Sequence, residues 1–275
     1  MMKALILAGG LGTRLRPLTY KIPKCLLTIN NKTILEHQLE LLEKFDEVIL
    51  ATNYLENKIK NYLSDINVSN VIINNEPERL GTAGAILNAR EILGKEFVVL
   101  NGDIITNFNI GSLLDSGPNS ILVQRVDDIS RYGNVIFEGN KVHKFREKAD
   151  IHSPGWINAG LYYLDRKIFD FIPMGRPVSI EREVFPALSK EGKMKVVMND
   201  CYWHDVGTKD DFINANLSLS GKDCVIGRNC KVTDSIISRS VIMDGCDIED
   251  SSIIDSIIGP NNNISGANVE NKIMP

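Results

Sequence analysis

Residues 224–271 repeat with a period of sixteen, and this feature restricts the fold of the chain more than any other. The three rows read CVIGRNCKVTDSIISR, SVIMDGCDIEDSSIID and SIIGPNNNISGANVEN. Their aliphatic positions align in three columns, five or six residues apart along the chain: Ile226/Ile242/Ile258, Val232/Ile248/Ile264 and Ile237/Ile253/Val269. One inward aliphatic residue for each side of a triangular coil predicts a short parallel β-helix in which each coil pairs with the next. The hexapeptide-like spacing favours the left-handed form.

The rest of the chain has a different texture, in which short β-branched runs alternate with amphipathic segments. Strands are expected at 3–8, 47–50, 71–73 and 97–100, and helices at 33–45, 82–92 and 208–219. This alternation predicts an α/β fold with a Rossmann-like, mixed and mostly parallel sheet and helices on both faces. We therefore expect two domains, an α/β domain over 1–220 and a β-helix of three coils over 221–275.

Composition and charge exclude several classes of protein. The 275 residues include 31 basic and 35 acidic side chains, which argues against a general nucleic-acid or membrane-surface protein. No apolar run approaches the roughly 20 residues that cross a bilayer. The five cysteines are scattered and odd in number, so we expect reduced thiols in a soluble, cytoplasmic protein. All four histidines precede the repeat, which disfavours an acyltransferase with a histidine base in the coil.

A glycine-rich loop follows the first expected strand, in the stretch LAGGLGTRLRPLTYKIPK over residues 7–24. It lacks the Walker string, and Leu15 stands where a dinucleotide-binding loop has its last glycine. A loop of this kind can surround a triphosphate with backbone N–H groups and cations. No acidic residue precedes Glu36 in the chain. About four anionic charges of a triphosphate would then meet about four cations of the loop: Arg14, Arg16, Lys21 and Lys24.

Residues 1 to about 218 resemble the sugar-1-phosphate nucleotidyltransferases, which make nucleotide sugars. The signature LAGGLGTRLRPLT with Pro23-Lys24 carries the resemblance, and a β-helical tail is also found in members of that family. Further matching strings are Leu80-Gly81-Thr82-Ala83-Gly84, Leu100-Asn101-Gly102-Asp103, Arg131-Tyr132-Gly133, Phe145-Arg146-Glu147-Lys148, Ile157-Asn158-Ala159-Gly160, Ser179-Ile180-Glu181-Arg182-Glu183 and Trp203-His204-Asp205-Val206-Gly207-Thr208.

The resemblance implies transfer of a nucleoside monophosphate from a nucleoside triphosphate to a sugar 1-phosphate, with release of pyrophosphate. The strings are most similar to those of enzymes that use GTP and mannose 1-phosphate. Alternatives are heptose 1-phosphate with GTP, glucose 1-phosphate with UTP or dTTP, and a non-catalytic protein that binds a nucleotide sugar and regulates an active relative. Leu15 disfavours a nicotinamide oxidoreductase.

Site residues follow from the same resemblance. Arg14, Lys24 and Asp103 are implied as catalytic, and Asp103 and Asp205 as the ligands of Mg²⁺. The sugar phosphate is expected at Gly133, Glu147, Lys148, Asn158 and Glu181, with Glu183 as an alternative to Glu181. Lys148 is followed by Ala149, where the family often has proline. The nucleotide is expected at Leu7, Ala8, Gly9, Gly10, Gly12, Thr13, Glu76, Gly81 and Thr82.

Two further expectations concern the base and the coil. Glu76 and Glu78 precede Gly81, where the family contacts the base, and a carboxylate accepts from both N1–H and the exocyclic amine of guanine. His204 is expected to orient or pack. Three coils leave an open stack, so the coil should pack against its own catalytic domain or against a second subunit in a homo-oligomer.

Overall fold

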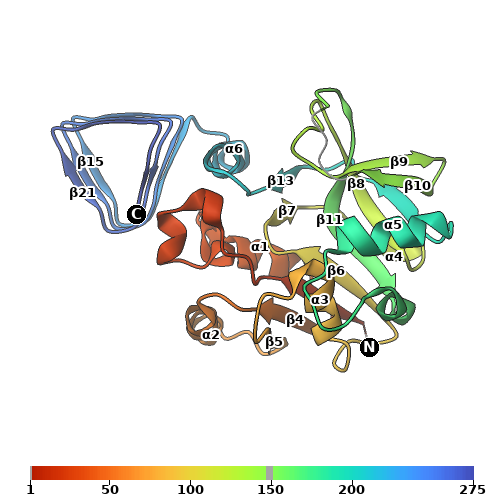
Figure 1. The fold of residues 1–275 in the computed structure, drawn as a ribbon. Coiled ribbons are helices and arrows are strands. Elements are labelled where there is room, and N and C mark those ends of the chain that lie inside the picture. The colour runs from red at the N-terminus through yellow and green to blue at the C-terminus, as the bar shows by residue number, and fades with distance from the viewer. Residues whose placement is uncertain (1, 147–150) are drawn as a thin grey trace.

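The computed structural model describes residues 2–146 and 151–275, and one large sheet dominates it (Figure 1). In the described part of the chain, β11 and β10 run against the other seven strands of this sheet, so the predicted mixed and mostly parallel sheet is confirmed. The strand order is β5 (Val71–Asn75), β4 (Glu47–Thr52), β1 (Lys3–Leu7), β6 (Glu96–Asn101), β11 (Gly155–Asp165), β8 (Ser120–Val126), β12 (Lys195–Met198), β10 (Lys141–Arg146) and β9 (Asn134–Glu138).

Helices cover both faces of the sheet, as the alternating pattern predicts. Successive strand residues point to opposite faces, so Leu5 of β1 joins one buried cluster while Ala4 and Ile6 join another. The Leu5 cluster includes residues of α3 (Gly81–Asn88) and α5 (Phe185–Lys190). The other cluster includes residues of α1 (Ile34–Leu41), α2 (Glu56–Asp65) and α4 (Ile110–Asp115).

Two short sheets lie at the edge of this core. β7 (Ile104–Thr106) pairs antiparallel with β13 (Trp203–Asp205), and β2 (Thr28–Ile29) pairs antiparallel with β3 (Lys32–Thr33). α1 begins with a capping box, in which the Thr33 side chain accepts from the Glu36 N–H and the Glu36 side chain accepts from the Thr33 N–H. α6 (Lys209–Ser220) follows β13 after a short turn and begins with a second capping box, formed by Thr208 and Asp211.

The repeat forms three parallel sheets that enclose a triangular prism, as a parallel β-helix does (Figure 1). The three predicted columns are in register, for example Ile237 with Ile253 and Val269. The sheets are β14 (Cys224–Ile226), β17 (Ser240–Ile242), β20 (Ile257–Ile258) and β23 (Ile273–Met274); β15 (Lys231–Thr233), β18 (Asp247–Glu249) and β21 (Asn263–Ser265); and β16 (Ile236–Ser238), β19 (Ser252–Ile254) and β22 (Asn268–Glu270).

The corners of the prism explain why Asn, Asp and Gly are frequent in the repeat. Nine residues there have positive φ, a conformation that glycine adopts freely and that Asn and Asp adopt at low cost. They form three columns, Asn229/Gly245/Asn261, Asp234/Asp250/Gly266 and Arg239/Asp255/Asn271. Serine hydroxyls also link the coils, since the Ser256 N–H donates to Ser240 Oγ at 3.0 Å.

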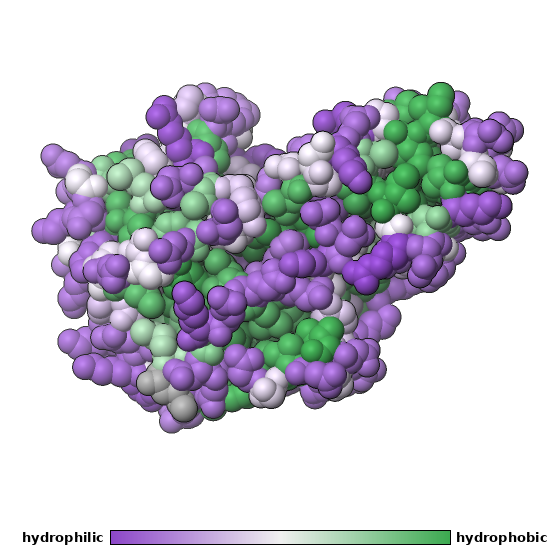
Figure 2. Space-filling model, turned by 180° about the vertical axis from the view of Figure 1, so that it is seen from behind, coloured by the Kyte–Doolittle hydropathy of each residue, from purple (hydrophilic) through white to green (hydrophobic). Residues whose placement is uncertain are grey.

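The prism packs against its own α/β domain, which is the first of the two arrangements predicted for the open stack of coils. A buried cluster joins Val241 and Ile257 of the prism to Phe212 of α6 and to Leu15 and Leu18 of the glycine-rich loop. The first coil carries no further coil on its outer side in this structure, and Ile226 of the inward column is 41% exposed. Seen from behind, hydrophobic residues also gather over the prism (Figure 2).

Candidate active site

A cavity of about 340 Å³ lies at the carboxyl edge of the parallel half of the sheet. Leu7 ends β1, Asn53 follows β4, Glu76 follows β5 and Asn101 ends β6, and all four line the cavity. Ligands of open α/β sheets bind at this edge because the loops after parallel strands converge there. Asp103, two residues after the end of β6, also lies in the cavity wall.

The glycine-rich loop forms a second wall of the same cavity. Gly12 adopts φ +58°, and a Cβ there would lie 2.9 Å from Thr19 Cγ2, so the loop needs glycine at this point. All nine residues expected at the nucleotide line this cavity, together with Arg14, Lys24 and Asp103: Leu7, Ala8, Gly9, Gly10, Gly12, Thr13, Glu76, Gly81 and Thr82.

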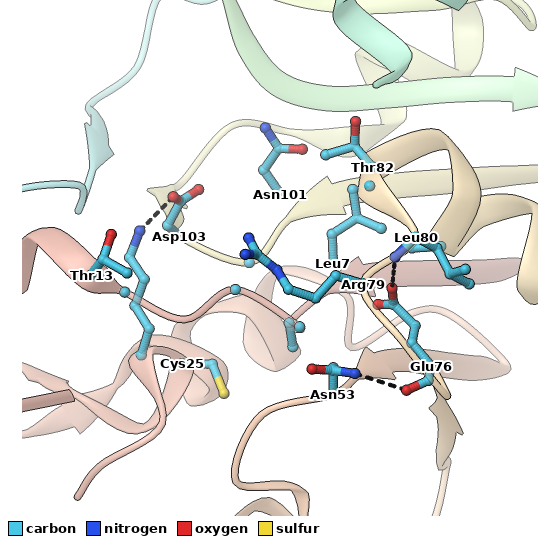
Figure 3. Close-up of a pocket in the computed structure, with 18 of the residues that line it drawn as sticks. Leu7, Thr13, Cys25, Asn53, Glu76, Arg79, Leu80, Thr82, Asn101 and Asp103 are labelled. Atoms are coloured by element: carbon cyan, nitrogen blue, oxygen red, sulfur yellow. Dashed lines mark hydrogen bonds and ion pairs between the residues drawn. The ribbon is translucent and has the colours of Figure 1, made fainter. Parts of the chain in front are cut away.

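Lys24 and Asp103 meet across the cavity. Lys24 Nζ lies 2.5 Å from Asp103 Oδ2. Figure 3 shows Asp103 on the side of the cavity opposite Glu76 and Asn53. Both side chains are partly buried, with 12% and 29% of their surface exposed. The turn that carries Asp103 is tightly packed, because a Cβ on Gly102 would lie 2.3 Å from the Leu7 carbonyl oxygen.

Glu76 lies at the opposite end of the cavity and is only 7% exposed. Burial raises the pKa of its carboxyl group, while the Leu80 N–H and the charge of Arg79 act in the other direction. A Cβ on Gly9 would lie 2.8 Å from Glu76 Oε1, so glycine at position 9 leaves room for this carboxylate. The Asn53 amide donates to the Glu76 carbonyl oxygen at 2.9 Å and fixes its backbone.

A second cavity of about 210 Å³ adjoins the first and shares Asn101 and Asp103 with it. Three of the five residues expected at the sugar phosphate line it: Gly133, Asn158 and Glu181. The other two, Glu147 and Lys148, lie outside the described residues. Asn158 Nδ2 donates to the Tyr162 hydroxyl at 2.8 Å, and that hydroxyl lies 3.5 Å from Asn101 Oδ1. Hydrogen bonds through the buried Tyr162 thus connect the two cavities.

Glu181 and Glu183, the two alternatives for the sugar-phosphate site, occupy different positions in the structure. Glu181 lies in the second cavity and accepts from Thr82 Oγ1 at 2.8 Å, so it touches a residue of the first cavity. Glu183 lines neither cavity and is paired with Arg176, 2.5 Å away, in the described part of the chain. The two carboxylates are therefore not equivalent in position.

Asp205 faces Asp103 without a fully compensating cation. Burial, and then the negative charge of Asp103, raise the pKa of Asp205 from 3.8 to about 7. The pairing of β13 with β7 places Asp205 opposite Ile104, next to Asp103 in the chain. Two carboxylates that disfavour each other's charge suit a divalent cation, and Mg²⁺ binds through one or two carboxylates plus substrate phosphates and water. The residues present therefore fit the predicted Mg²⁺ site.

The expectation that four cations of the loop would face a bound triphosphate is only partly correct. Arg14 and Lys24 line the first cavity, but Arg16 and Lys21 do not. The Arg16 guanidinium instead lies 4.7 Å from the centre of the Tyr20 ring. Glu78 is exposed and also lies outside both cavity walls, so the structure distinguishes it from Glu76.

Other cavity residues were not expected from the sequence. Arg79 extends across the first cavity in Figure 3, and only its neighbour Leu80 belongs to a recognised string. Arg131 lines the second cavity and pairs with Asp211 at 2.7 Å. It belongs to the string Arg131-Tyr132-Gly133, from which only Gly133 was expected at the site. Asn53 follows a strand that was predicted, but an isolated asparagine gave no signal of its own.

Adjoining cavities at the carboxyl edge, one enclosed by a glycine-rich loop with cations, define an α/β protein of the nucleotide-binding class. Comparison with family models identifies the member of that class. The model described as Nucleotidyl transferase matches residues 3–221, and the chain belongs to this family. In the described part of the chain, no helix is long and apolar enough to span a membrane.

Relatives and solved structures agree with this family. The chain is 40% identical over 228 residues to mannose-1-phosphate guanylyltransferase 1 of Arabidopsis thaliana, which covers 77% of this chain and 63% of that protein. It is 36% identical over 311 residues to the probable mannose-1-phosphate guanylyltransferase 3 of Oryza sativa subsp. japonica, covering 94% and 86%. The crystal structure of HddC from Yersinia pseudotuberculosis complexed with GMP-PN matches 80% of this chain and all of its own, with 32% identity and a TM-score of 0.69. Several of the relatives are thus spanned over only about 63% of their length.

Proposed function

We propose that this chain transfers guanosine monophosphate from GTP to mannose 1-phosphate, giving GDP-mannose and pyrophosphate. One observation carries the proposal: two cavities adjoin and share Asn101 and Asp103. A nucleotide in the first cavity and a sugar phosphate in the second would meet at these residues. The names of the Arabidopsis and rice relatives support this choice of substrates.

The first cavity would hold the triphosphate. Three cations line it, namely Arg14, Lys24 and Arg79, and the loop from Gly9 to Thr13 adds backbone N–H groups. Lys24 is paired with Asp103 in the free protein. A bound phosphate and a metal ion would give each partner a new counter-charge.

Guanine is the proposed base because of Glu76. A carboxylate can accept from N1–H and from the exocyclic amine of guanine, whereas uracil and thymine offer only one ring donor. Glu76 is buried in the cavity wall. Among the described residues, its carboxylate accepts one long hydrogen bond, from the Leu80 N–H at 3.4 Å, so it retains free acceptor capacity. The guanosine monophosphate in the name of the ligand bound to HddC supports the same base.

The second cavity would hold the sugar. Its hydroxyl groups can donate to Glu181 and exchange hydrogen bonds with Asn158 and the backbone at Gly133. We propose that Glu147 and Lys148 complete this site, with Lys148 on the sugar's phosphate.

The reaction needs positioning and charge stabilisation more than proton transfer. A phosphate monoester has its second pKa near ~6, so the attacking oxygen is already anionic at neutral pH. That oxygen forms a bond to the α-phosphorus, and the bond from the α-phosphorus to the bridging oxygen breaks, leaving its electron pair on pyrophosphate. Lys24 would stabilise charge at the α-phosphate and Arg14 the charge that develops on the leaving group.

Asp103 and Asp205 are the proposed ligands of Mg²⁺. When bound there, the ion would supply positive charge to phosphate oxygens of both substrates. In the part of the chain that the structure describes, no group of three or more His, Cys, Asp or Glu side chains could hold a metal ion by itself. The remaining ligands would therefore be phosphate oxygens and water.

We further infer that the coil is left-handed and that the protein works in the cytoplasm. Inward residues spaced five or six apart, three to each sixteen-residue coil, support the handedness. All five cysteines are free thiols, and burial raises the pKa of the Cys25 thiol to about 12, so this one is unreactive. Free thiols support a reducing compartment.

The test is pyrophosphate release over a matrix of GTP, UTP and dTTP against mannose, glucose and heptose 1-phosphates, with Mg²⁺ and with EDTA. We expect GTP with mannose 1-phosphate to give the highest kcat/KM and EDTA to abolish turnover. The Asp103→Asn chain serves as the inactive control. Faster reaction with UTP or dTTP would contradict the assignment of Glu76, and no release from any pair would contradict an enzymatic role in favour of a nucleotide-sugar sensor.

A further inference from the structure

The prism side made by β14, β17, β20 and β23, here called the junction sheet, is apolar on both of its faces. Its inward column is Ile226, Ile242, Ile258 and Met274, of which Ile242 and Ile258 are fully buried inside the prism. Its outward column is Val225, Val241, Ile257 and Ile273, which belong to a different hydrophobic cluster. A solvated sheet would carry polar residues on its outer face, as β18 does with Asp247 and Glu249.

This outward column shares a hydrophobic cluster with neighbours of two proposed active-site residues. Leu15 and Val206 are both 0% exposed and lie in the same cluster as Val241 and Ile257. Leu15 directly follows Arg14 in the chain, and Val206 directly follows Asp205. The prism therefore completes the hydrophobic core on which these two catalytic segments rest.

The space between Arg14 and Asp205 is narrow. A Cβ on Gly207 would lie 2.8 Å from Arg14 Nη2 and 3.3 Å from Asp205 Oδ1, so the two side chains flank this glycine closely. The Val206 N–H also donates to the Asp103 carbonyl oxygen at 2.9 Å, which joins Asp103 to the segment of Asp205. A small shift of Leu15 or Val206 would change the separation of the three charged groups.

Polar contacts attach the prism to the same region. Lys209 Nζ, in the first turn of α6, donates to the Asp255 carbonyl oxygen at 2.8 Å. Arg228 of the first coil donates to the Asn31 carbonyl oxygen at 2.7 Å. α6 in turn is tied to the β2–β3 connection, because the Asn30 N–H donates to Asn216 Oδ1 at 2.9 Å. The prism is thus attached both to α6 and to the β2–β3 connection.

We propose that the outward column of the junction sheet is a positioning element for the active site. It holds Leu15 and Val206 in place, and through them sets the separation of Arg14, Asp205 and Asp103. The kinetic part of this inference rests on the proposed function, whereas the structural part does not.

Two isoleucines of the prism form a matched pair for the test. Ile257 and Ile253 are both 0% exposed and lie four residues apart, but Ile257 belongs to the junction cluster and Ile253 to the interior of the prism. Ile257→Ala and Ile253→Ala remove the same atoms from two successive coils of the prism. Both should lower the melting temperature, because each leaves a cavity in a buried cluster.

Hydrogen–deuterium exchange of the full chain gives a readout that does not depend on catalysis. The amides of Leu15 and Val206 are hydrogen-bonded, to Gly12 and to Asp103, each at 2.9 Å. We expect Ile257→Ala to accelerate exchange in peptides that cover 13–20 and 204–208 at least fivefold, and Ile253→Ala to change it by less than twofold. Equal exchange in the two variants would overturn the proposal.

Steady-state kinetics test the consequence for turnover. At a temperature where circular dichroism shows both variants folded, Ile257→Ala should lower kcat at least fivefold and raise the Mg²⁺ concentration needed for half-maximal rate. Ile253→Ala should leave both within twofold, and parallel losses in both variants would overturn the kinetic part. If Ile257→Ala does not fold, Ile257→Val against Ile253→Val makes the same comparison with one methylene removed. Failure of the proposed function would appear as an inactive wild-type chain, and the exchange comparison would still decide the structural part.

Discussion

Lys24 is the residue on which the proposed chemistry depends most. It is the cation of the glycine-rich loop that reaches Asp103, 2.5 Å away, whereas Lys21, three residues earlier, is exposed and lines neither cavity. Charge alone did not distinguish these two lysines in the sequence. The loop conformation, with its separate turns at Thr13–Leu15, Leu18–Tyr20 and Lys24–Leu26, decides which side chain enters the cavity.

We predict that Lys24→Ala lowers kcat by about 10²–10³, the usual effect of losing one donor that stabilises charge in a transition state. Lys21→Ala is the matched control, since it removes an exposed cation from the same loop, and should retain kcat within about twofold to threefold, because one exposed donor outside the cavity contributes no such stabilisation. Pyrophosphate release under saturating substrates measures both. Turnover above half of wild type in Lys24→Ala would contradict the role given to this lysine.

At the scale of elements, the pairing of β7 with β13 brings distant carboxylates together. Asp103 precedes β7, and Asp205 ends β13, a hundred residues later. The antiparallel register sets Asp205 beside Asp103, and their mutual repulsion adds to the burial that raises the pKa of Asp205 to about 7. Bringing these two carboxylates together lowers the free energy of unfolding of the metal-free protein.

The repulsion between the two carboxylates predicts how the stability of the protein depends on pH. Because the pKa of Asp205 is higher in the folded chain than its ordinary value of 3.8, the free energy of unfolding falls as pH rises from about 4 to about 7, and the loss is complete above pH 7. In EDTA, Asp205→Asn should therefore stabilise the protein at pH 8 by up to about 4 kcal/mol, given about three pKa units at about 1.4 kcal/mol each. The gain should shrink as pH falls toward 5.

Thermal unfolding of Asp205→Asn and wild type at pH 5 and pH 8 measures this difference. Asp210→Asn is a suitable control, since Asp210 is an exposed acidic residue of α6 that lines neither cavity. A melting temperature of Asp205→Asn equal to or below wild type at pH 8 would refute the proposed repulsion.

Much of this architecture could be predicted from local pattern. The strands β1, β4, β5 and β6 carry β-branched runs and fall within two residues of the expected ends, and the inward columns of the coil follow from the sixteen-residue period. α1 ends at Leu41, before the predicted 45, because the apolar spacing that continues to Phe45 belongs to a turn that still packs on the core. Antiparallel β11, which crosses the middle of the sheet, left no comparable local signal.

The candidate site was predictable where a string of residues fixes a local conformation. Gly12 and the Gly102–Asp103 turn are such cases, because close approach of the backbone excludes other residues there. Arg79 and the outward face of the junction sheet were not predictable, since both depend on how distant elements pack. In the repeat, Val241 and Ile257 look like ordinary strand residues. The outer face is apolar because it shares a hydrophobic cluster with α6 and the glycine-rich loop.

For the whole molecule, the central claim is that two adjoining cavities hold the two halves of one product. The cavities share Asn101 and Asp103, and the prism shares a hydrophobic cluster with α6 and with Leu15 of the glycine-rich loop. A nucleotide sugar would therefore lie across both, with its diphosphate at the shared residues.

A crystal structure of this chain with GDP-mannose and Mg²⁺ tests the claim most directly. We predict guanine against Glu76 in the first cavity, mannose beside Asn158 and Glu181 in the second, and the diphosphate between Lys24 and Asp103. A nucleotide sugar bound elsewhere, or one with its sugar in the first cavity, would contradict the account.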